Sequence, residues 1–487
     1  MFTVEQKLDY VRPLNNSKVS NNNIFIVGLV IIFTIVVLLT PSIGPMMHPD
    51  SSSYLKFSDF RSAFYPVFLD IFRYFGLTLA QIIGLQIFIF SLSVYFLLMA
   101  LSRICNKKVF ILIYIAILSS NIWFTSLHKY ILTESIYISL NIVAIAALII
   151  FLFKGATRHI FIFSLMTGLA IGVRPSGVLM LMLMPIILIS AYNRFNLFRW
   201  KWVFALVIPI VVAQILELTL YRAYHGDSYR PTIMNIIMFG KGAMVNGDFE
   251  FYGPHKEILH EFSNDLDSEF GQVNVFIDEI PYFWLKNQSL PNYEIYAQFK
   301  VLVNKKKEYA EKSGISKDEI MLELGGQRIS QEIGQWVKNS LYYYAGSWGL
   351  RVTTFPFFVD EYNDWVLNHP NIPLNDRIPY LPLKGDLKPS IVSLIAFPAL
   401  LFAGIISGVI GLMFLAVLFL NKKIPLLFML SGIISIGIHG SLLFSSFVNV
   451  ATPRYTTTQF PMLVLVFLLM TMWILPIIKS KMKLLKK

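Results

Sequence analysis

Residues 131–153 read ILTESIYISLNIVAIAALIIFLF, an apolar run in which Glu134 is the only charged residue. About 20 apolar residues in a helix cross the ~30 Å hydrocarbon core of a bilayer. Because lipid offers the backbone no hydrogen bonds, such a segment is expected to cross as a helix. The run therefore predicts a transmembrane helix with an acidic residue near one end.

The same pattern recurs along the chain and predicts about ten spans. Residues 159–192 are the least regular part, because Arg174-Pro175 divides them into two short spans or one helix with a re-entrant break. The candidate spans lie near residues 24–43, 79–101, 109–125, 131–153, 159–173, 175–192, 202–220, 393–420, 424–446 and 459–478.

The composition of the 487 residues supports a polytopic α-helical membrane protein. Hydrophobic residues make up 55% and charged residues 14%, a balance that polar surface could not cover in a soluble globule of this size. The formal net charge of +12 would suggest a nucleic-acid partner in a soluble chain. Here most of the cations lie in short loops between apolar runs, so no nucleic-acid partner is predicted. The single Cys105 excludes an intramolecular disulfide.

The distribution of Lys and Arg predicts the orientation, since cytoplasmic loops carry an excess of these residues. With the N-terminus inside, every inside segment is basic, and the short outside loops carry chiefly Lys129, Arg174 and Arg454. Both termini are therefore expected in the cytoplasm. The inside cations are Lys7, Arg12, Lys18, Arg103, Lys107, Lys108, Lys154, Arg158, Arg194, Arg199, Lys201, Lys422, Lys423, Lys479, Lys481, Lys483, Lys486 and Lys487.

This topology predicts four parts. They are a cytoplasmic tail (1–23), an N-terminal transmembrane module (24–220) with a first outer loop (44–77), an extracytoplasmic soluble domain (221–390), and a C-terminal transmembrane module with a basic tail (391–487).

The outer domain is expected to be mainly helical and irregular. Helices are predicted at 304–310 and 315–344, with a break near Gly325-Gly326. An irregular return to the membrane is predicted at 355–388, which is rich in Pro, Asn and Asp.

The first outer loop carries aromatic and apolar residues every three or four positions from Tyr54 to Phe75. Amphipathic helices of this kind lie along a membrane surface. We expect two short interfacial helices with a bend near Tyr65, the second one beginning at Pro66.

Two acidic residues are candidates for catalysis on the outer side. Asp50 lies just beyond the first span, and the alternative is a helix N-cap before Ser51. Glu134 lies at the outer end of its span, where an acidic residue usually has a partner or a task. The alternative for Glu134 is a structural ion pair with Lys129, and His128 is a second plausible partner.

Two arginines complete the outer cluster. Arg174 lies between two spans and Arg454 precedes the last one. Both could snorkel to lipid headgroups or clamp a phosphate with paired hydrogen bonds. The topology places Asp50, Glu134, Arg174 and Arg454 at one membrane face, which suggests a site.

No glycine-rich nucleotide loop, HExxH, GxSxG or convincing aspartate pair for a metal occurs, which argues against soluble nucleotide donors.

These residues resemble the C-type (GT-C) superfamily of integral membrane glycosyltransferases, which take a sugar from a polyprenyl-phosphate carrier. The likeness covers roughly residues 24–220 and 393–478. One departure is that many members have an Asp-Glu pair in the first loop, whereas Ser51 follows Asp50 here. The similar motifs are Asp50 with Ser53-Tyr54-Leu55, Arg61, Tyr65-Pro66, Thr133-Glu134-Ser135, Arg174-Pro175 with Gly177, and Pro453-Arg454-Tyr455 with Pro461.

The resemblance implies a GT-C-like bundle in which a first-loop acidic residue is the base and outer-face cations hold the lipid phosphate. Asp50 and Glu134 are then the expected catalytic carboxylates. Donor phosphate would be held by Arg174, Arg454, Lys129 and His128, and substrate would be positioned by Arg61, Tyr65 and Tyr455. No metal ligand or cofactor is predicted, and the participation of a divalent cation is left open.

The expected activity is transfer of a sugar from a polyprenyl-phosphate donor to a cell-envelope glycan, glycolipid or protein, with inversion at the sugar carbon. The expected location is a bacterial cytoplasmic membrane with an extracytoplasmic active site. Two alternatives stay open. One is a transporter or flippase of lipid-linked saccharides, and the other is a polymerase or ligase of lipid-linked oligosaccharides.

Overall fold

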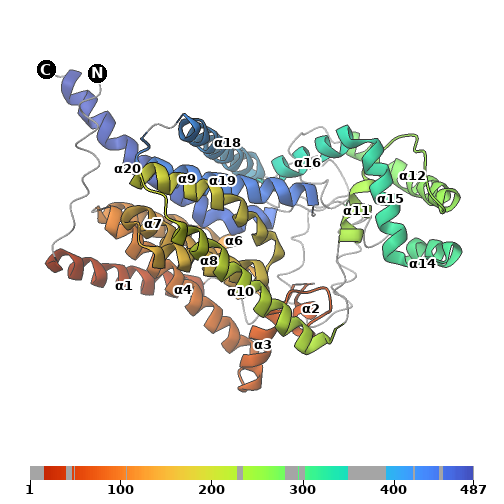
Figure 1. Cartoon of the computed structure of the whole chain (residues 1–487), viewed down its shortest axis with the longest axis horizontal. Helices are drawn as coiled ribbons and strands as arrows, with labels where there is room; N and C mark the ends of the chain where they lie inside the picture. Colours follow the sequence, from red (N-terminus) through yellow and green to blue (C-terminus); the bar gives the residue numbers. More distant parts are fainter. Residues whose placement is uncertain are drawn as a thin grey trace. The chain divides into compact units, whose positions relative to one another are not determined.

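The computed structural model describes helices and short connections. Among the described residues the one β-type pairing is an isolated bridge between Met46 and Tyr130. The chain divides into two compact units (Figure 1). The first comprises residues 1–228, 405–441 and 457–487, and the second comprises 229–404 and 442–456. The structure describes residues 16–39, 46–48, 50–105, 107–227, 234–279, 294, 302–348, 391–420, 423–448 and 453–485.

Seven helices within the described ranges are long and apolar enough to cross a membrane, so the chain is a helical membrane protein. Three shorter apolar helices coincide with further predicted spans, and the count of ten spans stays a prediction. The seven are α4 (Leu79–Ile104), α7 (Glu134–Lys154), η3 with α9 (Pro175–Met182, Leu183–Phe195), α10 (Trp200–His225), α18 (Ile391–Phe419), α19 (Leu426–Val448) and α20 (Pro453–Leu485). The shorter three are α1 (Asn16–Leu39), α5 (Lys108–Ser120) and α8 (Thr157–Val173).

The first unit is built around α7, which packs against α4 and α8, while α8 also packs against α10. Helix α7 is apolar on all sides because it is enclosed by other helices. Helices α8 and α10 approach closely at Gly168, where a Cβ would lie 2.9 Å from the Ile210 Cα. Small residues permit such close helix contacts inside a membrane.

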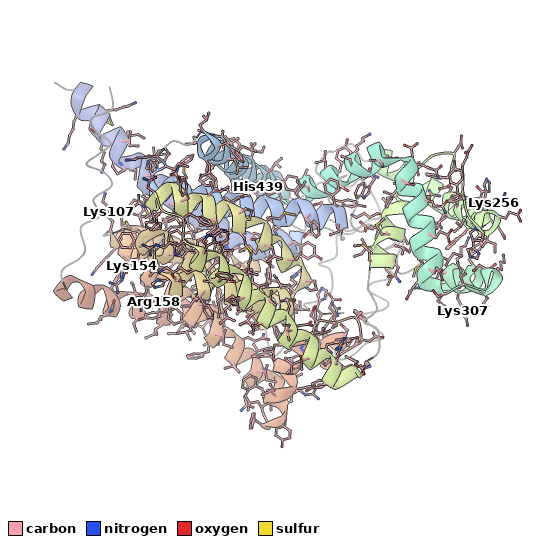
Figure 2. The ribbon with its side chains drawn as sticks, viewed as in Figure 1. Lys107, Lys154, Arg158, Lys256, Lys307 and His439 are labelled. Atoms are coloured by element: carbon pink, nitrogen blue, oxygen red, sulfur yellow. The ribbon has the colours of Figure 1, made fainter. Side chains whose placement is uncertain are left out.

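Helices α7 and α8 form a hairpin, so their ends lie in two groups, one at each end of the hairpin. Helix α7 ends at Lys154 and α8 begins at Thr157, so the start of α7 and the end of α8 lie together at the other end of this hairpin. In Figure 2 the labelled Lys107, Lys154 and Arg158 lie near one end of the first unit. These are three of the cations predicted to face the cytoplasm.

The first outer loop differs from the sequence prediction. Its helices are α2 (Ser51–Leu55) and α3 (Phe64–Tyr74), so the interruption lies between them rather than near Tyr65, and Pro66 is the third residue of α3. Phe57 follows α2 with a φ of 44°, a left-handed conformation that ends the helix. Pro66 is tolerated because the first turn of a helix needs no backbone donor.

The helices within residues 159–192 are interrupted at Arg174. Arg174 has an extended backbone (φ −146°, ψ 113°), as expected for a residue before proline, and it separates α8 from η3. Both sequence alternatives, two short spans or one helix with a re-entrant break, placed an interruption at Arg174-Pro175, and the structure has it there.

The second unit contains α11 (Met234–Ala243), α12 (Lys256–Glu279), α14 (Leu302–Ser313), α15 (Lys317–Gln331) and α16 (Ile333–Ser347). The break predicted at Gly325-Gly326 is wrong, because both glycines lie inside α15 and the helix ends before Glu332. Gly325 instead lets α11 approach, since a Cβ there would lie 2.3 Å from the Met238 carbonyl oxygen. The irregular segment predicted at 355–388 lies outside the described residues.

Arg328 anchors this second unit. Its side chain is fully buried and donates to Asp267 at 2.7 and 3.1 Å, to the Gly242 carbonyl at 2.9 Å and to the Val245 carbonyl at 2.6 Å. Several hydrogen bonds of this kind are needed to bury a guanidinium. Helices α11, α12 and α15 are thus tied together by one residue.

Candidate functional site

The first outer loop is tied to the segment that leads into α7. The Met46 N–H donates to the Lys129 carbonyl at 3.0 Å, and the Ile131 N–H donates to the Met46 carbonyl at 3.1 Å. The Ser51 hydroxyl donates to the Ile131 carbonyl at 2.9 Å. These bonds position the residues around Asp50 beside the start of the helix that carries Glu134.

Asp50 forms an ion pair with Arg61. The Asp50 Oδ1 accepts from the Arg61 Nη2 at 2.9 Å, and the Asp50 Oδ2 lies 3.5 Å from the His48 Nδ1. Asp50 does occupy the N-cap position of α2, yet its side chain makes no capping hydrogen bond. The carboxylate is 35% exposed, so it is held by a cation while still accessible to solvent.

Arg61 holds more than the carboxylate. Its Nε donates to the Ser53 hydroxyl at 2.8 Å and its Nη1 donates to the Tyr54 hydroxyl at 2.9 Å. The guanidinium also lies 4.2 Å from the centre of the Tyr54 ring. Arg61 therefore fixes the positions of the Asp50 and Tyr54 side chains relative to each other.

A second ion pair joins Glu134 and Arg174 across the start of α7 and the end of α8. The Arg174 Nη1 lies 3.0 Å from the Glu134 Oε1, and their side chains are 13% and 2% exposed. The extended backbone before Pro175 takes Arg174 out of the helix at this point. The sequence alternative paired Glu134 with Lys129, whereas the Lys129 Nζ donates to the Leu38 carbonyl at 3.0 Å.

Tyr54 is within electrostatic range of both ion pairs. Burial is the main cause that raises the pKa of the Tyr54 hydroxyl, and the charges of Arg61, Glu134, Asp50 and Arg174 all act on it. The two arginines lower this pKa and the two carboxylates raise it. Because charge effects fall with distance, all four groups belong to one neighbourhood around Tyr54. The sequence placed Asp50, Glu134 and Arg174 at one face and gave Arg61 a substrate-positioning role. In the structure Arg61 is the fourth charge that acts on Tyr54.

The Tyr65 ring packs against the Tyr54 ring. Their rings meet edge to face with centroids 5.3 Å apart, and the Tyr65 hydroxyl donates to the Gln86 Oε1 at 2.7 Å. Burial raises the pKa of Tyr65 well above its ordinary value, so its hydroxyl stays protonated. Tyr65 is enclosed by protein and acts on the site through Tyr54.

Glu217 on α10 is a residue whose role the sequence prediction missed. It is 5% exposed, and its Oε1 accepts the Ala63 N–H at 2.8 Å at the beginning of α3. The Tyr221 hydroxyl, one turn further along α10, donates to the Asp59 carbonyl at 2.7 Å. The sequence feature that could have indicated this role is the acidic residue itself, because Glu217 interrupts an otherwise apolar run.

His128 and Lys129 are buried beside this site. The His128 ring is fully buried, stacks on Phe90 at 3.6 Å between centroids and shares a hydrogen bond with the Ser135 hydroxyl. Burial lowers the pKa of His128 to about 3, so the imidazole is neutral at neutral pH. Burial also lowers the pKa of Lys129. The structure gives His128 a packing role and no positive charge to offer a phosphate.

Arg454 and Tyr455 lie at the start of α20, in the part of that helix that belongs to the second unit, so their place in the cluster stays a prediction. The side chain of Arg454 lies outside the described residues. Among the side chains that are described, no group of three or more His, Cys, Asp or Glu residues is arranged to hold a metal ion.

Comparison of the chain with family models, with curated proteins and with solved structures gave no match in any of the three.

Proposed function

We propose that this chain is a membrane glycosyltransferase. It moves a sugar from a polyprenyl-phosphate carrier to a hydroxyl of a cell-envelope glycan, glycolipid or protein. The observation that carries the proposal is the pair of ion pairs, Asp50–Arg61 and Glu134–Arg174, which both act electrostatically on Tyr54 in a helical membrane unit.

Asp50 is the general base in this proposal. The acceptor hydroxyl attacks the anomeric carbon, Asp50 takes its proton, and the carbon–oxygen bond to the lipid phosphate breaks with its electron pair on the phosphate. Base assistance of this kind contributes about 10²–10⁴ in rate. Arg61 contacts the Asp50 carboxylate at 2.9 Å and holds it in place for this role. A single displacement inverts the sugar carbon.

Arg174 stabilises the leaving phosphate. A guanidinium presents five N–H donors in a planar fork, so it can contact Glu134 and a phosphate oxygen at once. A contact of this kind is worth on the order of 4 kcal/mol at an effective dielectric near 20. Glu134 holds Arg174 in place before the donor binds and prevents an unpaired charge in a buried position.

The site lies on the extracytoplasmic side of a bacterial cytoplasmic membrane, with both termini in the cytoplasm. The carrier keeps its tail in lipid, so its phosphate reaches the protein at the membrane surface. This accounts for catalytic side chains at the ends of membrane helices.

The test is transfer from a radiolabelled polyprenyl-phosphate sugar to an envelope extract by the purified full chain in liposomes. Asp50→Asn is expected to lower transfer about 10²–10⁴-fold. The matched control is Asp70→Asn, another aspartate of the same outer loop, which lies 3.6 Å from Arg73 and is expected to retain transfer. Equal transfer by wild type and Asp50→Asn contradicts the base assignment. Movement of labelled lipid across the vesicle without bond formation identifies a flippase instead.

A further inference from the structure

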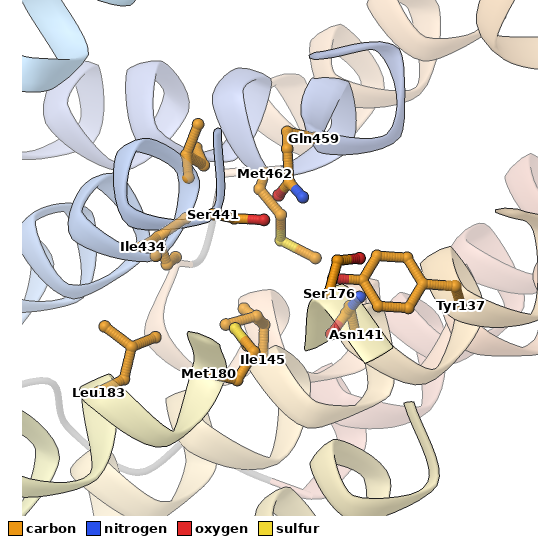
Figure 3. A pocket seen from close by; sticks show the side chains of 12 residues that line it. Tyr137, Asn141, Ile145, Ser176, Met180, Leu183, Ile434, Ser441, Gln459 and Met462 are labelled. Atoms are coloured by element: carbon orange, nitrogen blue, oxygen red, sulfur yellow. The ribbon is translucent and has the colours of Figure 1, made fainter. Parts of the chain in front are cut away.

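The first unit is closely packed where four of its elements meet (Figure 3). The cavity between α7, η3, α19 and α20 has a volume of about 20 Å³, which holds about one water molecule. Tyr137, Asn141 and Ser441 are among the residues that line it. A ligand with a lipid tail or a sugar ring does not fit there, so such a ligand would have to bind at the outer surface of these helices.

Positive charge gathers at the end of the first unit where α7 turns into α8. Gly155 ends α7 with a φ of 68°, and Lys154 and Arg158 lie on either side of this turn. Both side chains are exposed (Figure 2). A Cβ on Gly155 would lie 3.2 Å from the Phe195 ring, so the turn packs directly on the end of α9.

The connection from α9 to α10 brings three more cations to this turn. The Trp202 and Phe151 rings lie 5.3 Å apart between centroids, and the Arg199 guanidinium lies 5.5 Å from the centre of the Trp202 ring. Arg194 lies in the last turn of α9, and Lys201 lies in the first turn of α10. The aromatic contacts therefore hold cations of two connections near each other.

A sixth cation comes from the segment that precedes α19. The Ile424 N–H donates to the Asn193 Oδ1 at 3.4 Å, which places the neighbouring Lys423 near the end of α9. Together these cations form a basic corner, which comprises Lys154, Arg158, Arg194, Arg199, Lys201 and Lys423.

The connections that carry the basic corner contribute no negative charge. They lie within residues 135–216 and 391–487, and neither range contains an Asp or a Glu. Like charges held near each other repel, and an anion that binds among them is attracted by several cations at once. The basic corner is therefore suited to an anionic ligand.

Exposed aromatic and apolar side chains lie directly beside these cations. On the connection from α9 to α10, Trp200 is 69% exposed, Leu197 is 44% exposed and Phe198 is 43% exposed. Aromatic side chains of this kind are enriched at the headgroup level of a bilayer. A ligand that matches both features has an anionic headgroup and apolar tails.

We propose that the basic corner binds an anionic phospholipid of the surrounding membrane through its phosphodiester group. Arg158 and Arg199 can each give paired hydrogen bonds to phosphate oxygens. The acyl chains lie along the exposed apolar face of α10, where Phe204 is 59% exposed and Ile208 is 51% exposed. Basic sites between membrane helices bind anionic headgroups in this way. The binding depends neither on the proposed sugar transfer nor on the side of the membrane that the basic corner faces.

The test measures lipid binding to the delipidated full chain in detergent by native mass spectrometry. The probes are phosphatidylglycerol, phosphatidylcholine with the same acyl chains, and glycerophosphoglycerol, which has the anionic headgroup without the tails. We expect phosphatidylglycerol to bind at least about tenfold more tightly than phosphatidylcholine, because several cations each add attraction. Glycerophosphoglycerol should not displace it.

Paired substitutions locate the site. Arg158→Gln together with Arg199→Gln should weaken phosphatidylglycerol binding about 25-fold, since each cation near an anionic surface is worth about fivefold. Arg158→Lys together with Arg199→Lys keeps the charge and should restore most of the binding. The matched control is Lys56→Gln together with Lys256→Gln, which removes the same charge from exposed positions outside the basic corner and should bind like wild type. The melting temperature in detergent shows that each variant is folded.

The contradicting outcomes are distinct from those for sugar transfer, because no sugar donor is present. Equal binding of the two phospholipids, or displacement by glycerophosphoglycerol, overturns the proposal. It is also overturned if a folded Arg158→Gln, Arg199→Gln variant binds phosphatidylglycerol like wild type. Equal weakening by the Lys56→Gln, Lys256→Gln control shows an effect of net charge alone and overturns it as well.

Discussion

Truncation of either member of the Glu134–Arg174 ion pair is expected to destabilise the first unit strongly. The two groups lie 3.0 Å apart, and their side chains are only 2% and 13% exposed. Removing one partner of a buried pair costs about 3–5 kcal/mol, because the survivor is left as an uncompensated charge. Glu134→Ala and Arg174→Ala should each cost this amount. The double variant leaves no such charge and should cost about 2–3 kcal/mol less than the sum of the two.

The assay is the apparent melting temperature of the purified full chain in detergent at a fixed heating rate. At roughly 2–3 °C per kcal/mol, each single variant should melt about 6–15 °C below wild type. The matched control is the exposed pair of Lys307 and Glu311, 3.9 Å apart with side chains 65% and 69% exposed. Its single and double variants should melt like wild type, since exposed pairs contribute little. Strictly additive shifts for Glu134 and Arg174 would refute a buried ion pair between them.

Three further predictions concern the surroundings of the site. Glu217→Leu removes the acceptor of the Ala63 N–H and should lower the free energy of unfolding by about 1–3 kcal/mol. It should lower kcat for sugar transfer more than it raises KM. Glu217→Gln, which keeps an acceptor oxygen, should restore much of the rate. Gly172→Ala places a Cβ 2.4 Å from the Phe64 ring and should lower the melting temperature, whereas Gly84→Ala, which meets open space, should not. Burial lowers the pKa of His128 from 6.5 to about 3, so the neutral ring's contribution to stability is complete above pH 6.5 and is lost as pH falls from there toward 3. When the pH falls from about 8 to about 4, the melting temperature of His128→Gln should therefore fall less than that of wild type.

The membrane helices could be predicted because their signal is local and strong. A run such as 131–153 has no other stable arrangement once it is in lipid, so hydropathy alone locates the helix. The position of Arg174 between two helical segments likewise follows from the proline after it.

The pairing within the site could not be read from the sequence. Arg61 reaches Asp50 only because the loop between them turns at Phe57 in a left-handed conformation, which is uncommon for a bulky residue. Glu217 is far from Ala63 in sequence, and only the packing of α10 near α3 reveals its role. Gly325 resembles a helix break, but its small size serves a close helix contact instead.

The central claim is that these ionisable groups face the outside of the cell, opposite the basic loops. In a Cys105→Ser background, Lys56→Cys and Arg158→Cys each introduce one exposed thiol, the first beside α2 and the second on α8. An impermeant thiol reagent applied to intact cells should label Lys56→Cys at once and Arg158→Cys only after permeabilisation. Labelling of both positions from the outside, or protection of Lys56→Cys until the membrane is opened, would contradict the account.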